Sequence, residues 1–440
     1  MIPARKLLLL ISLSAIPALA EDPSPQIDPE RVRWVAEHAV AVRSIDPADE
    51  DFSDLMPLVQ VIGKARVVQL GEATHGDGAT FLAKGRLIRF LHQVMGFDVL
   101  AWESGFFDVR RLDAALRGGL PSAEAARRGL YLAWQNQETM ATLEYVRASQ
   151  GTDRPIDVVG FDCRVSRDES RAELFPKMVF DFFDRLDPSL ISKNEREDFT
   201  TMSVGLLPAD YYYKPGLRSF NRELPRRLVE TIDRRRAELV VHFPPREIDY
   251  VRQSLVSFLA MDRALGPGDK PAFSQGYTRD TAMAENLLWW LNGPLKERKV
   301  VVWAHNYHVM NDLYLRTASP GVAPVREAKS PIEGGPMGRF LKDELGSDLY
   351  TIGFDSHGGS TLGEEGKDVP VVPGFLETLL HAAGLPLLFL DLSRLPTDHW
   401  LRSPLTGSFY FHEPHPANWS RVFDGIFFVD TQKPARPLPK

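Results

Sequence analysis

The sequence predicts an α/β fold with a central, largely parallel β-sheet that is flanked by helices and interrupted by a helical insertion. Three features predict this fold: short apolar runs rich in β-branched and aromatic residues, helical patterns between most of these runs, and polar clusters directly after five of them. Strands that alternate with helices form parallel sheets, because each helix carries the chain back to the same edge.

Seven apolar runs are the expected strands. They lie at residues 65–70, 98–102, 156–160, 300–303, 349–353, 387–390 and 426–429. The first five end in polar residues, which is typical of a buried strand that leads into a loop. The sequence therefore predicts a sheet of six to seven strands.

Helical periodicity marks the segments between the strands. We expect helices near residues 80–95, 106–116, 137–149 and 280–291. Gly96 follows the first of them, and the sequence Asn292-Gly293-Pro294 follows the last. Glycine and proline at these positions end helices, which supports both boundaries.

The stretch from about 166 to 265 breaks the alternation of strands and helices. It is rich in charged residues at helical spacing, so we interpret it as a helical insertion whose arginine clusters form a solvated face. As an alternative, residues 211–216 (YYYKPG) could form a lid that faces a substrate. Residues 356–360 and 363–366 are rich in glycine and lack apolar periodicity, and predict a mobile surface excursion.

The first twenty residues have the pattern of a signal peptide. Arg5 and Lys6 precede an apolar segment at 7–16, and the small-x-small sequence at 18–20 forms a cleavage site before Glu21. We therefore expect a mature domain of residues 21–440 that is secreted or periplasmic. The alternative is an uncleaved N-terminal anchor. No later apolar run approaches the roughly 18 residues of a spanning helix, so no membrane span is expected.

Charge and cysteine content exclude several classes of protein. The 52 Lys and Arg residues against 59 Asp and Glu give a net charge of -7, which disfavours nucleic acid as a partner. The single cysteine, Cys163, excludes an intrachain disulfide and zinc sites built from several thiolates. Cys163 itself is expected to be a small core residue, and any metal would need histidine and carboxylate ligands.

Titratable residues follow the first five expected strands. These residues are Glu72, His75, Glu103, Asp162, His305, His308 and Asp355. The carboxyl ends of parallel strands meet at one edge of a sheet, where ligands bind in open α/β folds. So many ionisable groups are costly to bury without a task. The sequence therefore predicts a functional site at this edge.

Two types of chemistry suit these residues. In the first, His75 acts as a general base on water while Glu72 fixes its tautomer. In the second, Glu72, His75, Glu103, His305 and His308 bind a divalent metal that generates hydroxide. The residue types alone do not distinguish between these two chemistries. The sequence lacks a Gly-x-Ser-x-Gly elbow, a phosphate-binding loop and a dinucleotide fingerprint, which disfavours the corresponding enzymes.

The arrangement of these motifs resembles the erythromycin esterase family. The resemblance rests on residues 70–76 (LGEATHG), Lys84, Gly96-Phe97 and Trp102-Glu103, on Arg279-Asp280 with 283–286 (MAEN), on 302–309 (VWAHNYHV), and on Met337-Gly338 with Leu341. It covers nearly the whole mature chain. The resemblance implies an α/β core with a helical insertion and hydrolysis of the macrolactone ester of macrolide antibiotics, without a tightly held metal cofactor.

The same resemblance implies a role for each site residue. His75 would be the general base, Glu72 and Glu103 would orient it or the water, and His305 would bind the reacting carbonyl or assist proton transfer. The residues expected to bind the substrate are Lys84, His308, Arg279 and Asp162. Lys84 stands where the family places a basic residue, often arginine, and a lysine lacks the bidentate fork of a guanidinium.

Three functions follow from these observations. The first is an exported carboxylic-ester hydrolase that acts on a small-molecule ester, with a macrolide as the implied substrate. The second is a metal-dependent hydrolase of another ester or a phosphoester. The third is a protein that binds haem or another ligand through the same histidines, because the family resembles exported binding proteins in fold. Some relatives carry names from succinoglycan biosynthesis, which leaves the substrate open.

Overall fold

The structure is a computed structural model. It describes residues 27–165, 169–206, 222–265, 278–312, 335–361 and 368–438. The expected signal peptide at 1–20, the expected lid at 211–216 and residues 363–366 lie outside the described residues. Among the described helices, none has both the length and the apolar character needed to cross a bilayer.

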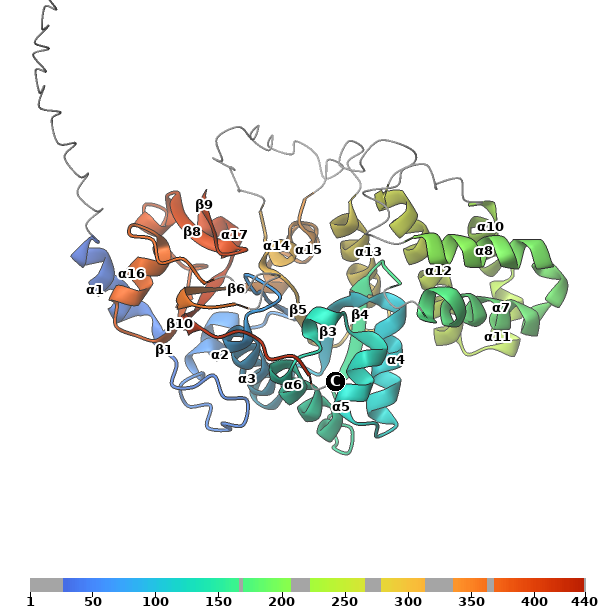
Figure 1. Cartoon of the computed structure of the whole chain (residues 1–440), viewed down its shortest axis with the longest axis horizontal. Coiled ribbons are helices and arrows are strands. Elements are labelled where there is room, and N and C mark those ends of the chain that lie inside the picture. Colours follow the sequence, from blue (N-terminus) through green and yellow to red (C-terminus); the bar gives the residue numbers. More distant parts are fainter. Residues whose placement is uncertain are drawn as a thin grey trace, which may run out of the picture.

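An eight-stranded sheet forms the centre of the fold, in the order β1-β7-β10-β6-β2-β5-β3-β4 (Figure 1). Its strands are β1 (Val40–Ala41), β2 (Val67–Leu70), β3 (Val99–Gly105), β4 (Asp157–Asp162), β5 (Val300–Trp303), β6 (Leu349–Gly359), β7 (Leu387–Asp391) and β10 (Gly425–Gln432). Neighbours from β10 to β4 pair in parallel, and only β7 and β1 add antiparallel pairs. The predicted largely parallel α/β fold is confirmed, and β1 is too short to be recognised in the sequence.

Helices cover both faces of the sheet. One face packs against α2 (Pro57–Ile62), α3 (Gly78–Met95), α4 (Phe106–Arg117), α5 (Ser122–Gly129) and α6 (Gln137–Ser149). The other packs against α1 (Pro29–His38), α13 (Arg279–Asn292), α14 (Asn306–Val309), α15 (Met337–Leu345), α16 (Leu376–Ala382) and α17 (Trp419–Val422). Val68 and Leu70 face the first layer and Val67 the second, as the alternation of a strand requires. The four helices predicted from periodicity are α3, α4, α6 and α13.

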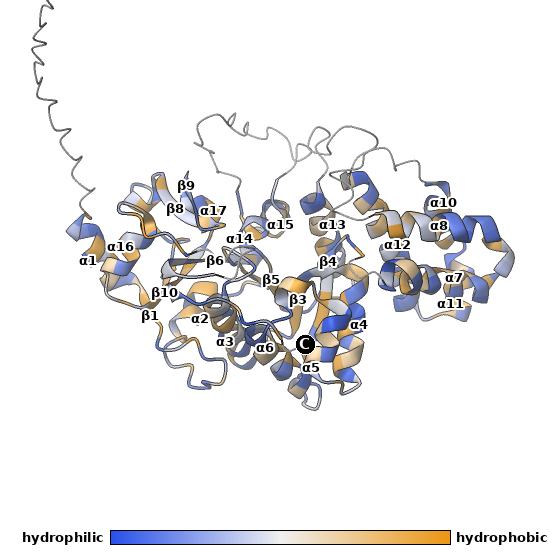
Figure 2. Ribbon diagram, in the orientation of Figure 1, coloured by the Kyte–Doolittle hydropathy of each residue, from blue (hydrophilic) through white to orange (hydrophobic). Residues whose placement is uncertain are grey.

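A separate group of helices lies beside α4 at one end of the sheet (Figure 1). It contains α7 (Phe175–Leu186), α8 (Lys193–Gly205), α10 (Glu223–Arg234), α11 (Arg236–His242) and α12 (Pro245–Leu265). These helices share an apolar cluster of their own, in which the rings of Phe175, Phe199 and Phe258 lie 5.2 to 5.8 Å apart. Figure 2 shows hydrophilic residues on their outward sides. Cys163 is buried against α12, and burial raises the pKa of its thiol, as expected of a core residue.

Strand β6 corrects one expectation. The sequence predicts a surface excursion at 356–360, yet residues up to Gly359 continue β6 and pair with β10. Gly359 has a φ of 95°, and a Cβ there would lie 2.1 Å from the carbonyl oxygen of Gln432. The glycines therefore permit close pairing with β10, and do not mark a loop. Asp355 consequently lies within a strand, and its side chain is buried.

A two-stranded hairpin of β8 (Leu405–Tyr410) and β9 (Glu413–Ala417) closes over the sheet near α16 and α17. Its turn residues, Phe411 and His412, both have positive φ values, 55° and 52°. Glycine or asparagine usually fills such a turn, so its sequence carries no signal for a hairpin. The hairpin was not predicted for this reason.

Candidate active site

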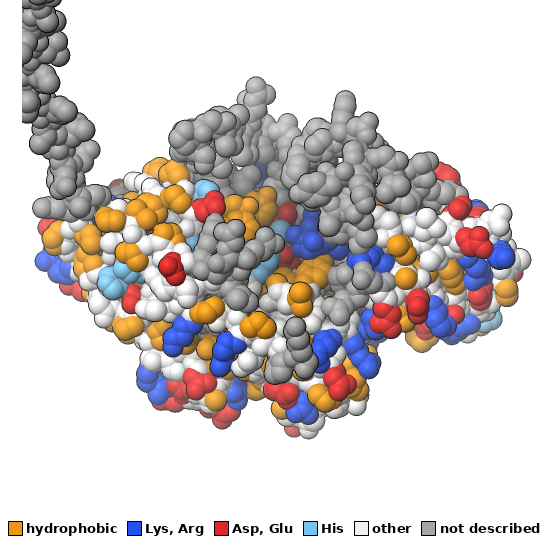
Figure 3. Space-filling model, in the orientation of Figure 1, with side chains coloured by type: hydrophobic (Ala, Val, Ile, Leu, Met, Phe, Trp, Pro, Cys, Tyr) orange, Lys and Arg blue, Asp and Glu red, His pale blue; other side chains and the backbone are white. Residues whose placement is uncertain are grey.

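The carboxyl ends of β2, β3, β4 and β5 meet at one edge of the sheet. The loop after β2 approaches α14 so closely that a Cβ at Gly71 would lie 2.0 Å from Asn306 Oδ1. The Asn306 backbone N–H donates to the carbonyl of Glu72 at 2.8 Å, and its side-chain amide donates to those of Phe354 and Phe409, both at 2.7 Å. Asn306 thus holds the surrounding loops together. Figure 3 shows histidine and basic side chains close together near the centre of the face viewed.

Glu72 is the centre of the first half of the site. Its buried carboxylate faces His75 Nδ1 at 3.1 Å and accepts from Trp134 Nε1 at 3.0 Å, both on Oε1. Oε2 is paired with Lys84 Nζ. Because a carboxylate only accepts, the contact places the proton of neutral His75 on Nδ1 and leaves the lone pair on Nε2.

His75 is the accessible member of this group. Its side chain is 37% exposed, whereas that of Glu72 is fully buried. The rings of Trp134 and His305 meet it edge to face, with centroids 4.8 and 5.2 Å away. Within the described part of the chain, no group hydrogen-bonds Nε2 of His75. Glu72 therefore orients the His75 ring through Nδ1, and Nε2 is open to water.

Lys84, which was expected to bind the substrate, is fully buried in this structure, and its role stays a prediction. It projects from α3, is fully buried beneath the site, and lies 4.3 Å from the ring centroid of Trp303. Burial lowers the pKa of Lys84 to about 8, although Glu72 opposes this shift. Lys84 has no exposed surface, and its ion-pair partner is Glu72.

Glu103 is the centre of the second half of the site. Its Oε1 pairs with Arg279 Nη2 at 2.9 Å and His308 Nε2 at 3.1 Å, and its Oε2 accepts from the backbone N–H of His305 at 2.9 Å. Burial opposes ionisation of Glu103, but the nearby His308, His75 and Arg279 outweigh it and hold the pKa of Glu103 well below its usual range. The carboxylate is thus charged and fixed.

His308 lies between two carboxylates. Its Nδ1 contacts Asp280 Oδ1 at 2.6 Å, opposite the contact with Glu103. Burial lowers the pKa of His308, but the attraction of Asp280 and Glu103 outweighs this effect and raises it to about 9. His308 is buried and both ring nitrogens have partners, and its expected contact with the substrate stays a prediction. It serves to hold Glu103.

Asp162, also expected to bind the substrate, is buried among cationic partners, and that role stays a prediction. Its buried carboxylate accepts from Arg279, Arg164 and the Tyr131 hydroxyl, at 2.6, 2.7 and 2.6 Å. Burial opposes ionisation, but the two arginines outweigh it and lower the pKa of Asp162. Arg279 spans Asp162 and Glu103, and its side chain is 27% exposed. Arg164, at 23%, is exposed to a similar degree, so both cations of this half have accessible surface.

His305 is held by the backbone on both ring nitrogens. Nε2 lies 2.7 Å from the carbonyl oxygen of Ala73, and Nδ1 accepts from the N–H of Tyr307 at 3.0 Å. Burial, with the nearby His75 and His308, holds the pKa of His305 well below its usual value, so the ring is neutral. No nitrogen remains for a reacting carbonyl or for proton transfer. The role expected for His305 stays a prediction, and in this structure its ring contacts the His75 loop through the Ala73 carbonyl.

The same contacts bear on the second chemistry, in which these residues bind a metal. Glu72 is paired with Lys84, Glu103 with Arg279, and His305 with backbone groups. Their donor atoms therefore face protein partners and do not converge on a common point. Among the described residues, the histidine and carboxylate group with metal-like spacing lies elsewhere, on β6, α16 and β10.

The turn of the hairpin supports the His75 loop. The N–H of Phe411 donates to the carbonyl of Ala73 at 3.0 Å. His412 Nε2 lies 3.1 Å from Asp77 Oδ1, and Asp355 lies 3.6 Å from the other nitrogen. Burial lowers the pKa of His412, but these carboxylates raise it to about 10. The contacts offset the cost of two non-glycine residues at positive φ, about 1 to 3 kcal/mol each.

Several site residues were not predicted from the sequence. Tyr131 and Trp134 lie in the connection between α5 and α6, which carries no strand pattern, and Arg164 follows β4. They are noticed only through their contacts with Glu72 and Asp162. Asp280 lay beside Arg279 in the motif, so adjacency was the available signal.

Replacing His308 should change how stability depends on pH. The pKa of His308 rises from about 6.5 in the unfolded chain to about 9 in the folded one, so its contribution is complete below pH 6.5 and is lost as pH rises to about 9. Between about pH 7 and pH 8 this loss is about 1 kcal/mol, and His412 adds a similar one. Urea unfolding of His308→Gln should show a clearly smaller decrease than that of the wild type. An unchanged decrease would contradict the charged state of His308.

Comparison with known proteins places the chain in a family. A sequence model of the erythromycin esterase family matches residues 92–432, a range that begins after His75. The chain therefore belongs to the erythromycin esterase family. The name of this family and those of the relatives indicate a hydrolase with a small-molecule substrate.

Three similar proteins cover nearly the whole chain. YbfO of Bacillus subtilis (strain 168), which has a hydrolase name, is 25% identical over 425 residues and covers 91% of each chain. Erythromycin esterase type II of Escherichia coli is 26% identical over 434 residues, 90% of this chain and 96% of that protein. The crystal structure of a succinoglycan biosynthesis protein matches with a TM-score of 0.74 at 20% identity, over 93% of this chain and 98% of that one, which shows the shared fold.

Proposed function

We propose that the protein is an exported carboxylic-ester hydrolase that opens a macrolide lactone with a water activated by His75. One observation carries this proposal: His75 alone combines a buried carboxylate on Nδ1 with exposed surface and an Nε2 that no described residue hydrogen-bonds. A general base needs this combination, because one nitrogen must be oriented while the other reaches water.

The proposed reaction moves one proton out and back. His75 Nε2 takes a proton from water, and the resulting hydroxide attacks the ester carbonyl carbon to give a tetrahedral oxyanion. The carbon–oxygen bond of the ester then breaks, and the imidazolium returns its proton to the leaving alkoxide. Glu72 stabilises the imidazolium, and the positive charge of Arg279 favours the oxyanion. No metal enters these steps.

The surroundings of the site favour an apolar, cyclic substrate. The rings of Phe411 and Tyr410 lie 4.9 and 5.7 Å from the ring of His305, and Phe411 is 47% exposed. A macrolactone offers a large apolar surface next to one ester, which suits an aromatic wall beside a base. The name of the Escherichia coli relative supports the same substrate class. The signal-like segment at 1–20 supports export.

The direct test is incubation of the purified protein with erythromycin, with and without a chelator, followed by mass spectrometry. We expect a product that has gained one water and forms equally fast in both samples. Loss of turnover in chelator, restored by a divalent metal, would favour the metal-dependent hydrolase. Turnover of aryl esters without any change in erythromycin would support esterase activity and reject a macrolide as the substrate. A visible absorption band on haem titration, without turnover, would favour a binding protein.

A further inference from the structure

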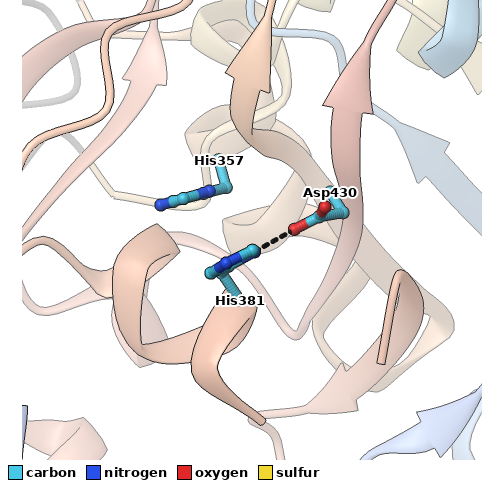
Figure 4. Close-up of side chains that lie close together, drawn as sticks. All are labelled: His357, His381 and Asp430. Carbon is cyan, nitrogen blue, oxygen red and sulfur yellow. Dashed lines mark hydrogen bonds and ion pairs between the residues drawn. The ribbon is translucent and has the colours of Figure 1, made fainter. Parts of the chain in front are cut away.

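A second cluster of ionisable side chains lies on the sheet away from the His75 group. His357 comes from β6, His381 from the last turn of α16, and Asp430 from β10 (Figure 4). Strands β6 and β10 are parallel neighbours in which Val429 pairs with Ser356, so the next residues, Asp430 and His357, lie side by side. Helix α16 packs on both strands and brings His381 close to His357 and Asp430.

The three side chains already approach one another closely. The rings of His357 and His381 are stacked, with centroids 4.0 Å apart and planes 12° from parallel. His381 Nδ1 lies 2.5 Å from Asp430 Oδ1. One potential ligand atom from each residue lies within 4.8 Å of the other two. Four-coordinate zinc has bonds of about 2.0 to 2.2 Å to such atoms, so its ligands stand roughly 3.4 Å apart. This spacing lies within the 4.8 Å limit, although the hydrogen-bonded His381 Nδ1 and Asp430 Oδ1, at 2.5 Å, would have to separate if both became ligands.

We infer that His357, His381 and Asp430 bind a divalent transition metal, Zn²⁺ in the first instance. Two imidazoles and one carboxylate are the ligand types that Zn²⁺ accepts, whereas Mg²⁺ and Ca²⁺ prefer oxygen ligands only. The side chain of His381 is 49% exposed, which leaves a fourth position open to water.

Binding requires the two imidazoles to rotate. A metal lies in the plane of each imidazole that binds it, so two stacked rings cannot both ligate until one turns about its Cβ–Cγ bond. This torsion is soft in histidine, and the exposure of His381 gives it room to move. In the bound state the ion would join α16 to β6 and β10, and would stabilise the fold by binding the native state alone.

Titration of the chelator-treated full chain with Zn²⁺ tests this site by calorimetry and by thermal unfolding. We expect one equivalent to bind and the melting temperature to rise by several degrees. His381→Ala and Asp430→Asn should each weaken binding at least tenfold and remove the rise. His242→Ala, which changes an exposed histidine on α11, should behave as the wild type. His75→Ala should also bind normally, which separates this site from the proposed active site.

Three outcomes would overturn the inference. The first is that the wild-type chain does not bind Zn²⁺. The second is that His381→Ala and Asp430→Asn both bind it with wild-type affinity. The third is that binding is lost in His75→Ala and retained in His381→Ala. Since no readout is hydrolysis, the result is independent of the proposed esterase activity. Co²⁺ provides a spectroscopic check, because the visible spectrum of bound Co²⁺ should disappear in the His357→Ala variant.

Discussion

His75→Ala should reduce kcat/KM for ester hydrolysis by at least about a hundredfold while the protein remains folded. A positioned general base contributes roughly 10² to 10⁴ in rate, and no second exposed base replaces it, because His305 and His308 are buried and fully hydrogen-bonded. The side chain of His75 is 37% exposed and its Nδ1 has one hydrogen-bond partner, Glu72. We therefore expect urea unfolding to change by no more than about 1 kcal/mol.

The matched control is His242→Ala, which removes an exposed histidine from α11 in the helical group. It should retain wild-type kinetics. Initial rates on erythromycin and on aryl esters measure both variants under the same conditions. Turnover in His75→Ala within tenfold of the wild type would remove His75 from the mechanism, provided that its circular dichroism and unfolding midpoint match the wild type.

Lys84→Met should destabilise the protein by roughly 3 to 5 kcal/mol. Lys84 and Glu72 form an ion pair in which neither side chain has exposed surface. Removing the lysine leaves a buried carboxylate that either remains charged without its cation or takes up a proton at a cost, and loss of one partner from a buried pair is strongly destabilising. Urea unfolding of the full chain measures the effect.

A double variant separates the charge from the packing. Lys84→Met combined with Glu72→Gln removes both charges and should recover most of the lost stability, although hydrolysis stays impaired because His75 loses its carboxylate. Lys177→Met is the control, because the pair of Lys177 with Asp181 is exposed and should contribute no more than about 1 kcal/mol. Wild-type stability in Lys84→Met would show that Glu72 needs no buried cation.

The convergence of the site was predictable, whereas the role of each residue was not. Glu72 and His305 follow β2 and β5, Glu103 lies near the end of β3, and the parallel sheet brings the three to one edge, as the pattern of strands and polar clusters predicts. Sequence cannot reveal that both nitrogens of His305 have partners, because the Ala73 carbonyl that meets Nε2 belongs to a distant segment. Only the packing of the Ala73 carbonyl and the Tyr307 amide against His305 distinguishes it from His75.

Burial distinguishes three of the residues that were expected to bind the substrate. Lys84, His308 and Asp162 are polar residues in a motif, and such residues are expected at a surface. Each is buried because an oppositely charged partner, contributed by a distant segment, offsets its loss of water. The sequence shows which residues are charged, but it does not show which of them form ion pairs in the fold.

The sequence by itself determined the α/β class, the largely parallel sheet, four of its covering helices and the family, because periodicity and motif order are local properties of the chain. Only the tertiary structure decided the eight-stranded order, the hairpin with its turn at positive φ, the exposure of His75, and the approach of His357, His381 and Asp430. These features depend on contacts between residues far apart in the chain. Their free energies come from burial and charge pairing, which exist only once the sheet has formed.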